Sequence, residues 1–164
     1  AAIAEGKHIQ SFPEFGPERR GAPVQAFTRL NTSAIRAYYG VYNPDAVIVL
    51  DSSLFNSVDV RRGLVPGGIL LINSDTSCGD VWKTFKTADE QIFVVEAHTI
   101  AMDCIGVPIP NTAMIGAMVK VADLMSLEET TEYFRKAFSS KFSSKVLEGN
   151  LKAIKRGYEE VKAQ

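Results

Sequence analysis

Cysteine is scarce in this sequence, with Cys78 and Cys104 as its two representatives, far apart and in no metal-ligand spacing. An iron–sulfur cluster normally takes four cysteine thiolates, so the chain's own residues cannot complete one. Cys78 has no histidine nearby in sequence to activate it, which argues against a nucleophilic role. We therefore expect both thiols to be reduced, as in a cytoplasmic protein.

An excess of charge of one sign is missing as well, and so are long apolar runs. Eighteen basic and nineteen acidic residues leave a formal net charge of -1, which gives no field for nucleic acid or an anionic membrane. No apolar run approaches the roughly 20 residues that a helix needs to span a bilayer. We therefore expect neither nucleic acid nor membrane as a partner. The 164 residues, 46% of them hydrophobic, suffice for one domain with a sizeable core.

The sequence does contain three short apolar runs, Val47–Leu50, Ile69–Ile72 and Ile92–Val95, each followed by polar residues. Continuous branched apolar residues without alternation are typical of strands buried on both faces. Segments of crossover length lie between them, such as Leu54–Leu64, which we expect to be a helix after a serine cap. The alternation predicts a single α/β layered domain over residues 1–164, with a mostly parallel sheet flanked by helices.

Before these runs, the sequence predicts an antiparallel-type edge hairpin. Val24–Leu30 alternates between apolar and polar residues, as a strand with two unlike faces does. A loop rich in proline and glycine joins it to Lys7–Phe12, and that composition predicts an ordered connection rather than a strand or helix.

After the runs, the sequence predicts helices up to its end. We expect Asn111 to cap a helix over Ala113–Val119, which is apolar nearly all round and therefore buried. Its small residues would let another backbone approach closely. Ser126 and Glu129 form a capping box that opens a helix over Leu127–Phe138. The last helix repeats apolar residues at three- and four-residue steps, at Leu147, Leu151, Ile154 and Tyr158.

The first residues, Ala1–Gly6, have the pattern of a helix end with glycine at the C-terminal cap. A βαβ unit would place a strand and a turn before such a helix. We therefore expect the domain to lack, in the sequence as given, its N-terminal strand and glycine-rich turn. That turn commonly carries the phosphate-binding glycines of such folds.

Polar residues follow each of the three predicted parallel strands. Asp51, Asn73 and Glu96 come just past the strand ends, where α/β folds place their ligands. Such residues also cap the next helix along the chain, and we favour capping for Asp51 and Asn73. Nothing pairs His98 with a nucleophile or a second base, so we expect a hydrogen-bonded structural histidine.

Arg19 and Arg20 are the strongest candidates for ligand contact. Guanidinium groups suit bidentate contacts with phosphate, and a loop rich in glycine and proline can hold them at an interface. The alternative is a structural loop in which Arg20 pairs with Glu18 or Glu14, or bonds loop carbonyls. We favour the structural loop and keep the contact with a cofactor or a partner chain as the rival.

Several stretches together resemble one family. They are Phe12–Val24 with Arg29 following, Pro44–Asp51, Val65–Ser74 and Ala101–Ala117. In this order they resemble the gamma subunits of pyruvate and other 2-oxoacid:ferredoxin oxidoreductases, over nearly the whole chain. The departure is at the N-terminus, where the family's strand and glycine-rich turn have no counterpart.

The resemblance implies an overall reaction in which a 2-oxoacid, pyruvate by the loop pattern, is oxidatively decarboxylated on thiamine diphosphate. Electrons pass through iron–sulfur clusters to ferredoxin, and the acyl group goes to coenzyme A. It also implies that thiamine diphosphate, Mg and the clusters belong to alpha, beta and delta subunits or their fused equivalents. The gamma-type chain would be inactive alone, with no catalytic or metal-binding residue of its own.

On this resemblance, the chain's part is structural, with a share in coenzyme A binding or in a subunit junction. The candidate residues for such a contact are Arg19, Arg20, Gly21, Asn73 and Asn111. Two rivals stay open. A free-standing nucleotide-binding module or dehydrogenase needs a Gly-x-Gly-x-x-Gly turn, which these residues do not contain. A pure assembly scaffold would use the Ala113–Val119 helix and the phenylalanine-rich C-terminal helices to bind neighbours.

Overall fold

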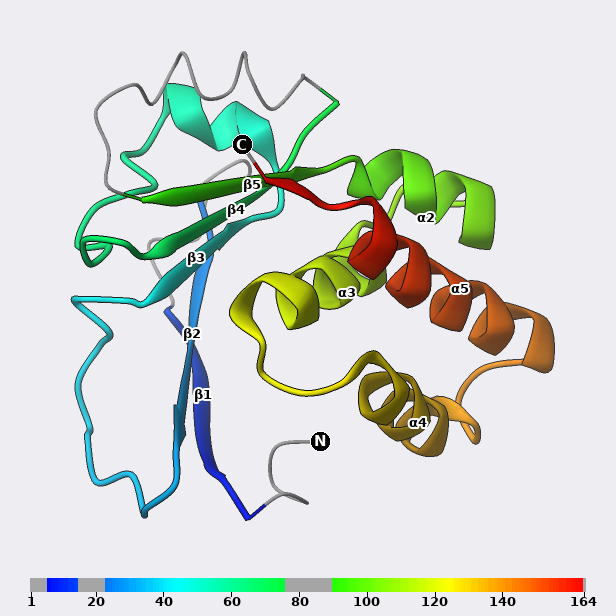
Figure 1. Cartoon of the computed structure of the whole chain (residues 1–164), viewed down its shortest axis with the longest axis horizontal. Helices are drawn as coiled ribbons and strands as arrows, with labels where there is room; N and C mark the ends of the chain where they lie inside the picture. The colour runs from blue at the N-terminus through cyan, green and yellow to red at the C-terminus, as the bar shows by residue number, and fades with distance from the viewer. Residues whose placement is uncertain (1–5, 15–22, 76–89, 164) are drawn as a thin grey trace.

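The computed structural model describes residues 6–14, 23–75 and 90–163 (Figure 1). Two sheets lie beside a group of helices. The main sheet has the order β3-β4-β5-β6, built from β3 (Ala46–Val49), β4 (Ile69–Asn73), β5 (Gln91–Val95) and β6 (Lys162–Ala163). Its first three strands are parallel, as predicted. β6 is antiparallel to β5, and with two residues it is too short for a sequence pattern to reveal.

The main sheet is covered on both faces, which explains its continuous apolar strands. On β4, Leu71 faces a core formed with the helices, whereas Leu70 and Ile72 face a second core on the opposite side. All three side chains are fully buried. Because successive residues of a strand point to opposite faces, a strand with a core on each side needs apolar residues at every position.

The hairpin also forms as predicted. β1 (His8–Glu14) pairs antiparallel with β2 (Gln25–Asn31), with His8 opposite Asn31 and Glu14 opposite Gln25. The two strands make a sheet of their own. None of their residues is buried. The proline- and glycine-rich loop that joins them falls outside the described residues.

The helices are α2 (Ala97–Ile105), α3 (Asn111–Ala122), α4 (Leu127–Phe138) and α5 (Ser144–Glu160). Figure 1 shows them together on one side of the sheets. None of those in the described ranges combines the length and the apolar character that crossing a membrane requires. The predicted capping box is present, since Ser126 accepts from the N–H of Glu129 and the Glu129 carboxylate accepts from the N–H of Ser126.

α3 and α5 cross at a close approach that small residues permit. A Cβ added at Gly116 would lie 1.8 Å from the carbonyl oxygen of Ile154, and one at Gly157 would lie 1.9 Å from that of Ala113. Both helices present glycine at the contact, so their backbones nearly touch. The expectation that the small residues of α3 admit another backbone is confirmed.

Two predictions about the ends of helices were wrong. Residues 54–64 do not form one continuous helix. The chain makes a short 3-10 helix, η1 (Ser52–Asn56), capped by Asp51 rather than by a serine, and then a series of turns. Gly63, in the left-handed region at φ 82°, allows the last turn to pack directly on the carbonyl oxygen of Tyr42. A continuous helix cannot include that conformation.

Asn111 does not cap α3. The cap residue is Pro110, whose carbonyl accepts from the N–H of Met114, and no side chain makes a capping hydrogen bond there. Proline fixes φ near the helical value, and Pro110 has φ -73°. The helix therefore starts one residue earlier than the asparagine suggested. At the other end of the chain, Gly6 has φ +75°, while residues 1–5 fall outside the description, so the predicted helix end over Ala1–Gly6 stays a prediction.

Candidate functional site

The carboxyl ends of β3, β4 and β5 bring the predicted strand-end residues together. The cleft there has a volume of about 290 Å³. Its lining residues are Asp51, Ser52, Asn73, Ser74, Asp75, Glu96, His98 and Thr99. The sequence singled out Asp51, Asn73, Glu96 and His98. It missed Ser52, Ser74, Asp75 and Thr99, although their positions shortly after a strand end or within the first turn of α2 were a usable signal.

Asn73 is the centre of this arrangement, with 2% of its surface exposed. Its Nδ2 donates to the carbonyl of Leu50 at 2.9 Å and lies 3.1 Å from Nδ1 of His98. Its Oδ1 accepts from the backbone N–H of Ala97 at 2.9 Å. The Asn73 side chain therefore bonds the start of α2, which follows the neighbouring strand, whereas the prediction placed its capping bond on the segment after its own strand. The same amide holds the ends of β3 and β4 and the start of α2 in one place.

Asp51 has the predicted capping role. Its Oδ1 accepts a 2.9 Å hydrogen bond from the backbone N–H of Ser53 at the start of η1. The hydrogen bonds from Ser53 lower the pKa of Asp51, and the nearby His98 adds a smaller effect in the same direction. Asp51 is therefore a carboxylate at neutral pH, fixed by the helix that it caps.

His98 is confirmed as a hydrogen-bonded histidine, because its ring lies against the Asn73 amide. Its side chain is otherwise exposed, as is that of Glu96, which occupies the N-cap position of α2 without a side-chain capping bond. Among the described residues, Asp51, Asp75 and Glu96 thus give the cleft three carboxylates against one histidine. Helix N-termini attract anions, but this acidic rim opposes a phosphate at the start of α2.

Of the remaining candidates, the structure describes Asn111. Arg19, Arg20 and Gly21 lie outside the described residues, and so does Cys78. Asn111 is exposed at the start of α3 and is not among the residues that line the cleft.

Cysteine supplies no cluster of ligands in the described ranges. Cys104 is half-buried, with its Sγ 3.9 Å from Nη1 of Arg156. Within residues 6–14, 23–75 and 90–163, no group of three or more histidine, cysteine, aspartate or glutamate side chains is placed to hold a metal ion.

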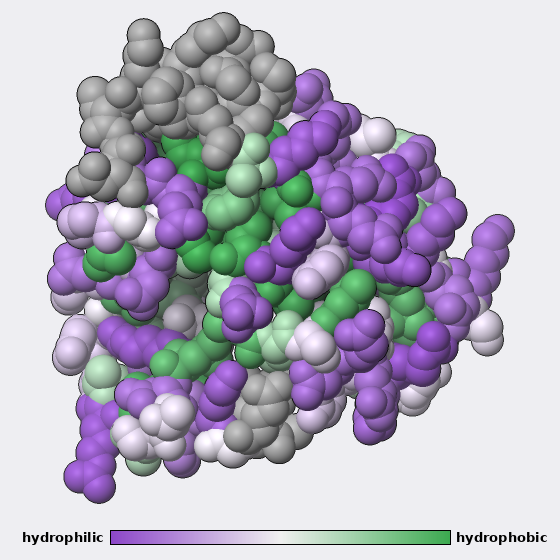
Figure 2. Space-filling model, viewed as in Figure 1, coloured by the Kyte–Doolittle hydropathy of each residue, from purple (hydrophilic) through white to green (hydrophobic). Residues whose placement is uncertain are grey.

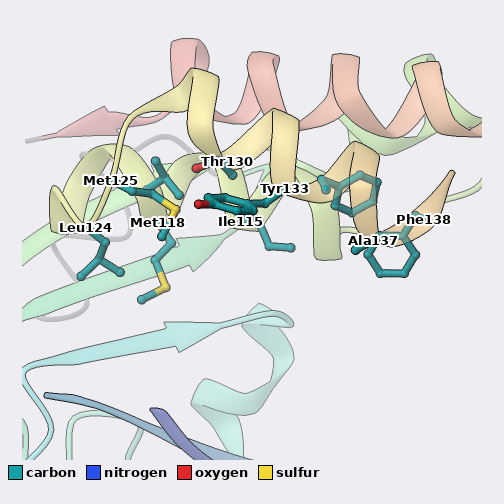
Figure 3. Close-up of a pocket in the computed structure, with 10 residues that line it drawn as sticks. Ile115, Met118, Leu124, Met125, Thr130, Tyr133, Ala137 and Phe138 are labelled. Carbon is teal, nitrogen blue, oxygen red and sulfur yellow. The ribbon is translucent and has the colours of Figure 1, made fainter. Parts of the chain in front are cut away.

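A second cavity, of about 360 Å³, lies between α3 and α4 and is lined almost entirely by apolar side chains (Figure 3). Its lining includes the side chains of Met118, Met125, Tyr133 and Phe138. Met114, in the helix that we expected to be buried, lies in the core, and Met118 both packs against that core and lines this cavity. Figure 2 likewise shows apolar surface in the middle of this face, between hydrophilic surfaces on either side. Because none of the described residues that line the cavity is a histidine or carries a charge, the polar cleft at the strand ends is the better candidate for chemistry.

Comparison with known proteins decides the family. The profile of the family described as pyruvate ferredoxin/flavodoxin oxidoreductase matches residues 1–160. The chain belongs to this family. The common gamma subunit of the pyruvate/ketoisovalerate oxidoreductases of Pyrococcus furiosus is 42% identical over 159 residues, covering 97% of this chain and 84% of the relative. The pyruvate synthase subunit PorC of Thermotoga maritima is 44% identical over 163 residues, covering 99% and 83%.

A solved structure supports the same assignment. The crystal structure of the pyruvate oxidoreductase subunit PORC of Thermotoga maritima superposes with a TM-score of 0.83 at 39% identity, covering 99% of this chain and 85% of that one. The predicted α/β fold and the predicted kinship with gamma subunits are confirmed. The chain is thus a subunit of an oxidoreductase of this family, and the alternative of a free-standing dehydrogenase is not supported.

Proposed function

We propose that this chain works as the gamma subunit of a heteromeric 2-oxoacid:ferredoxin oxidoreductase whose 2-oxoacid is pyruvate, beside alpha, beta and delta chains. The family match over nearly the whole length carries this proposal. The relatives named as gamma or PorC subunits of pyruvate enzymes support it. In the complex the oxoacid is oxidatively decarboxylated, the acyl group goes to coenzyme A and the electrons go to ferredoxin. We place this complex in the cytoplasm.

In this proposal, thiamine diphosphate, Mg and the iron–sulfur clusters belong to the partner chains. The donor set of the gamma chain supports that division. Two cysteines are half of what a cluster normally takes, and the thiol of Cys104 lies beside the guanidinium of Arg156. The gamma chain then contributes shape and contacts, and the electron path runs through its neighbours.

The residues that line the cleft at the strand ends argue against a coenzyme A contact there. Coenzyme A carries phosphate groups, and the carboxylates of Asp51, Asp75 and Glu96 would repel them. Asn73 has its amide engaged with Leu50, Ala97 and His98, which leaves it poorly suited to a ligand. Arg19 and Arg20, with Gly21 beside them, are therefore our candidates for the phosphate contact, and exposed Asn111 for a partner contact.

Steady-state kinetics of the assembled complex test the arginine contact. Replacing Arg19 and Arg20 together with alanine is expected to raise the KM for coenzyme A by about 10- to 100-fold, the value of losing one charged hydrogen bond, with a smaller change in kcat. The matched control is Lys152→Ala with Lys155→Ala, which removes two positive charges from the exposed side of α5. An unchanged KM in the arginine variant would favour the scaffold role over cofactor contact.

A further inference from the structure

The loop between β2 and β3 displays an unusual number of aromatic rings. Tyr38, Tyr39 and Tyr42 are 94%, 63% and 73% exposed, and they are three of the five tyrosines in the chain. Tyr39 and Tyr42 stack on each other, with ring centroids 6.3 Å apart and ring planes inclined by 8°. Single exposed apolar residues are ordinary, but large ones gathered in one place mark an interaction site.

Arg29 of β2 holds this aromatic loop in place. One guanidinium nitrogen of Arg29 donates to the carbonyls of Tyr39 and Gly40, at 2.5 and 2.8 Å, and the other donates to Oε1 of Gln10 at 2.7 Å. The same guanidinium lies 5.1 Å from the centre of the Tyr39 ring. Arg29 therefore fixes both the backbone and one ring of the loop on the hairpin.

Two further contacts complete the support. Gln10 of β1 uses its Nε2 to donate to the carbonyl of Ala37 at 2.7 Å. The carbonyl oxygen of Tyr42 packs on Gly63 so closely that a Cβ there would lie 2.0 Å away. The loop is thus fastened at Ala37, Tyr39, Gly40 and Tyr42 while its rings point to solvent. A surface that is already ordered loses little conformational entropy on binding, whereas a flexible loop would lose more.

The chemistry of the loop points to a protein partner. Rigid tyrosines are enriched at the centre of protein–protein contacts, where each can contribute a large share of the affinity. Stacked rings beside an arginine can also bind single-stranded nucleic acid. Here, however, the Arg29 guanidinium is already occupied by three oxygen acceptors, and the chain has a net charge of -1.

We propose that Tyr38, Tyr39 and Tyr42 anchor the contact with a partner subunit of the oxidoreductase, an inference that rests on the function proposed above. The rings fit an uncharged, concave protein surface that offers carbonyl oxygens to the tyrosine hydroxyls.

Covalent tyrosine labelling, read by mass spectrometry, tests this anchor without any substitution. The complex is captured from the native cell through a tag on this chain, and its labelling is compared with that of the free chain. Labelling of Tyr38, Tyr39 and Tyr42 is expected to fall by about tenfold on assembly, as for aromatics buried at the centre of an interface. Half-buried Tyr133 and Tyr158, on α4 and α5, serve as internal references. Equal labelling in both states would overturn the proposal.

A triple variant, Tyr38→Ser with Tyr39→Ser and Tyr42→Ser, tests the energetic role. Its dissociation constant for the partner chains is expected to rise by at least about 30-fold, the effect of losing one strong anchor. The control replaces Met102 and Ile109 with serine, since these are also exposed, at 50% and 53%. Thermal unfolding of each variant alone verifies its fold.

The outcomes separate the two proposals. Full assembly of the triple variant would overturn the tyrosine anchor and leave the proposed function standing. A wild-type chain that captures no partner subunits would instead remove the proposed function. A free chain that sediments as a dimer, and that the triple variant converts to a monomer, would show that a second copy occupies the loop and would also overturn the proposal.

Discussion

Asn73 and Ala97 are joined by a 2.9 Å hydrogen bond from the backbone N–H of Ala97 to the side-chain oxygen of Asn73. The bond connects the end of β4 to the first residue of α2, and the other end of the same amide holds the carbonyl of Leu50 after β3. One buried side chain thus fixes the relative positions of three elements around the candidate cleft. The arrangement makes Asn73 a structural residue of the site.

Replacing Asn73 with alanine is expected to lower the free energy of unfolding by about 2–4 kcal/mol, because the buried N–H of Ala97 and the partly buried carbonyl of Leu50 both lose their partner. Urea unfolding followed by circular dichroism measures this. His98→Ala is the control, since it removes an exposed ring and one contact with the same amide, and we expect a loss below about 1 kcal/mol. Equal stability of the two variants would contradict the role given to Asn73.

The close crossing of α3 and α5 predicts that adding a single methyl group at either glycine of the contact destabilises the fold. Gly116→Ala and Gly157→Ala would each bring a Cβ within 2 Å of a backbone carbonyl, so the helices must separate. We expect each to lower the free energy of unfolding by about 1–3 kcal/mol, the usual penalty of overpacking. Gly67→Ala is the control. Gly67 has φ +74° with no atom within 4 Å of an added Cβ, so the expected loss is about 1 kcal/mol from backbone strain alone.

The serine caps of α4 and α5 should contribute unequally to stability. Ser126→Ala removes the hydroxyl half of the capping box, which accepts from the N–H of Glu129 at 3.1 Å and donates to the Glu129 carboxylate at 2.7 Å. It is expected to lower the free energy of unfolding by about 1 kcal/mol. Ser143→Ala removes a single 3.5 Å bond at the start of α5 and should lower it less. Chemical unfolding of both variants checks the order, and the reverse order would be inconsistent with the box.

The same capping box predicts a pH dependence. The hydrogen bonds from Ser126 lower the pKa of Glu129 below its ordinary value of 4.5. A carboxyl group whose pKa is depressed by folding stabilises the fold above its unfolded pKa, and that contribution is lost as the pH falls through the folded pKa. Unfolding measured from pH 7 to pH 3 should therefore show the advantage of the wild type over Glu129→Gln shrinking below about pH 5. An advantage that grows in acid would have the wrong sign.

The parallel strands and the capping box could be predicted because their signals are local. Leu70, Leu71 and Ile72 in succession require a core on each face, and Ser126 with Glu129 satisfies a helix start within four residues. The same local reasoning was wrong for residues 54–64 and for Asn111. There, a left-handed glycine packed against Tyr42 and a proline already in helical geometry determined where the helices begin and end.

The position of the candidate site in the fold could be predicted from the sequence, but its hydrogen bonds could be predicted only in part. Parallel strands bring their carboxyl ends to one edge, so Asp51, Asn73 and Glu96 were expected near each other, and they line one cleft. No spacing in the sequence shows that the Asn73 amide turns to α2 rather than to the segment after its own strand. The clamp of Arg29 and Gln10 on the tyrosine loop is likewise a long-range contact, set by the register of the hairpin.

The central claim is that this chain supports chemistry carried out by partner chains. Pyruvate-dependent reduction of ferredoxin, with coenzyme A present, tests it most directly when measured on the purified chain and on the complex that the tagged chain captures from its native cell. We predict turnover by the captured complex and none by the chain alone. Turnover of pyruvate by the isolated chain would contradict the account.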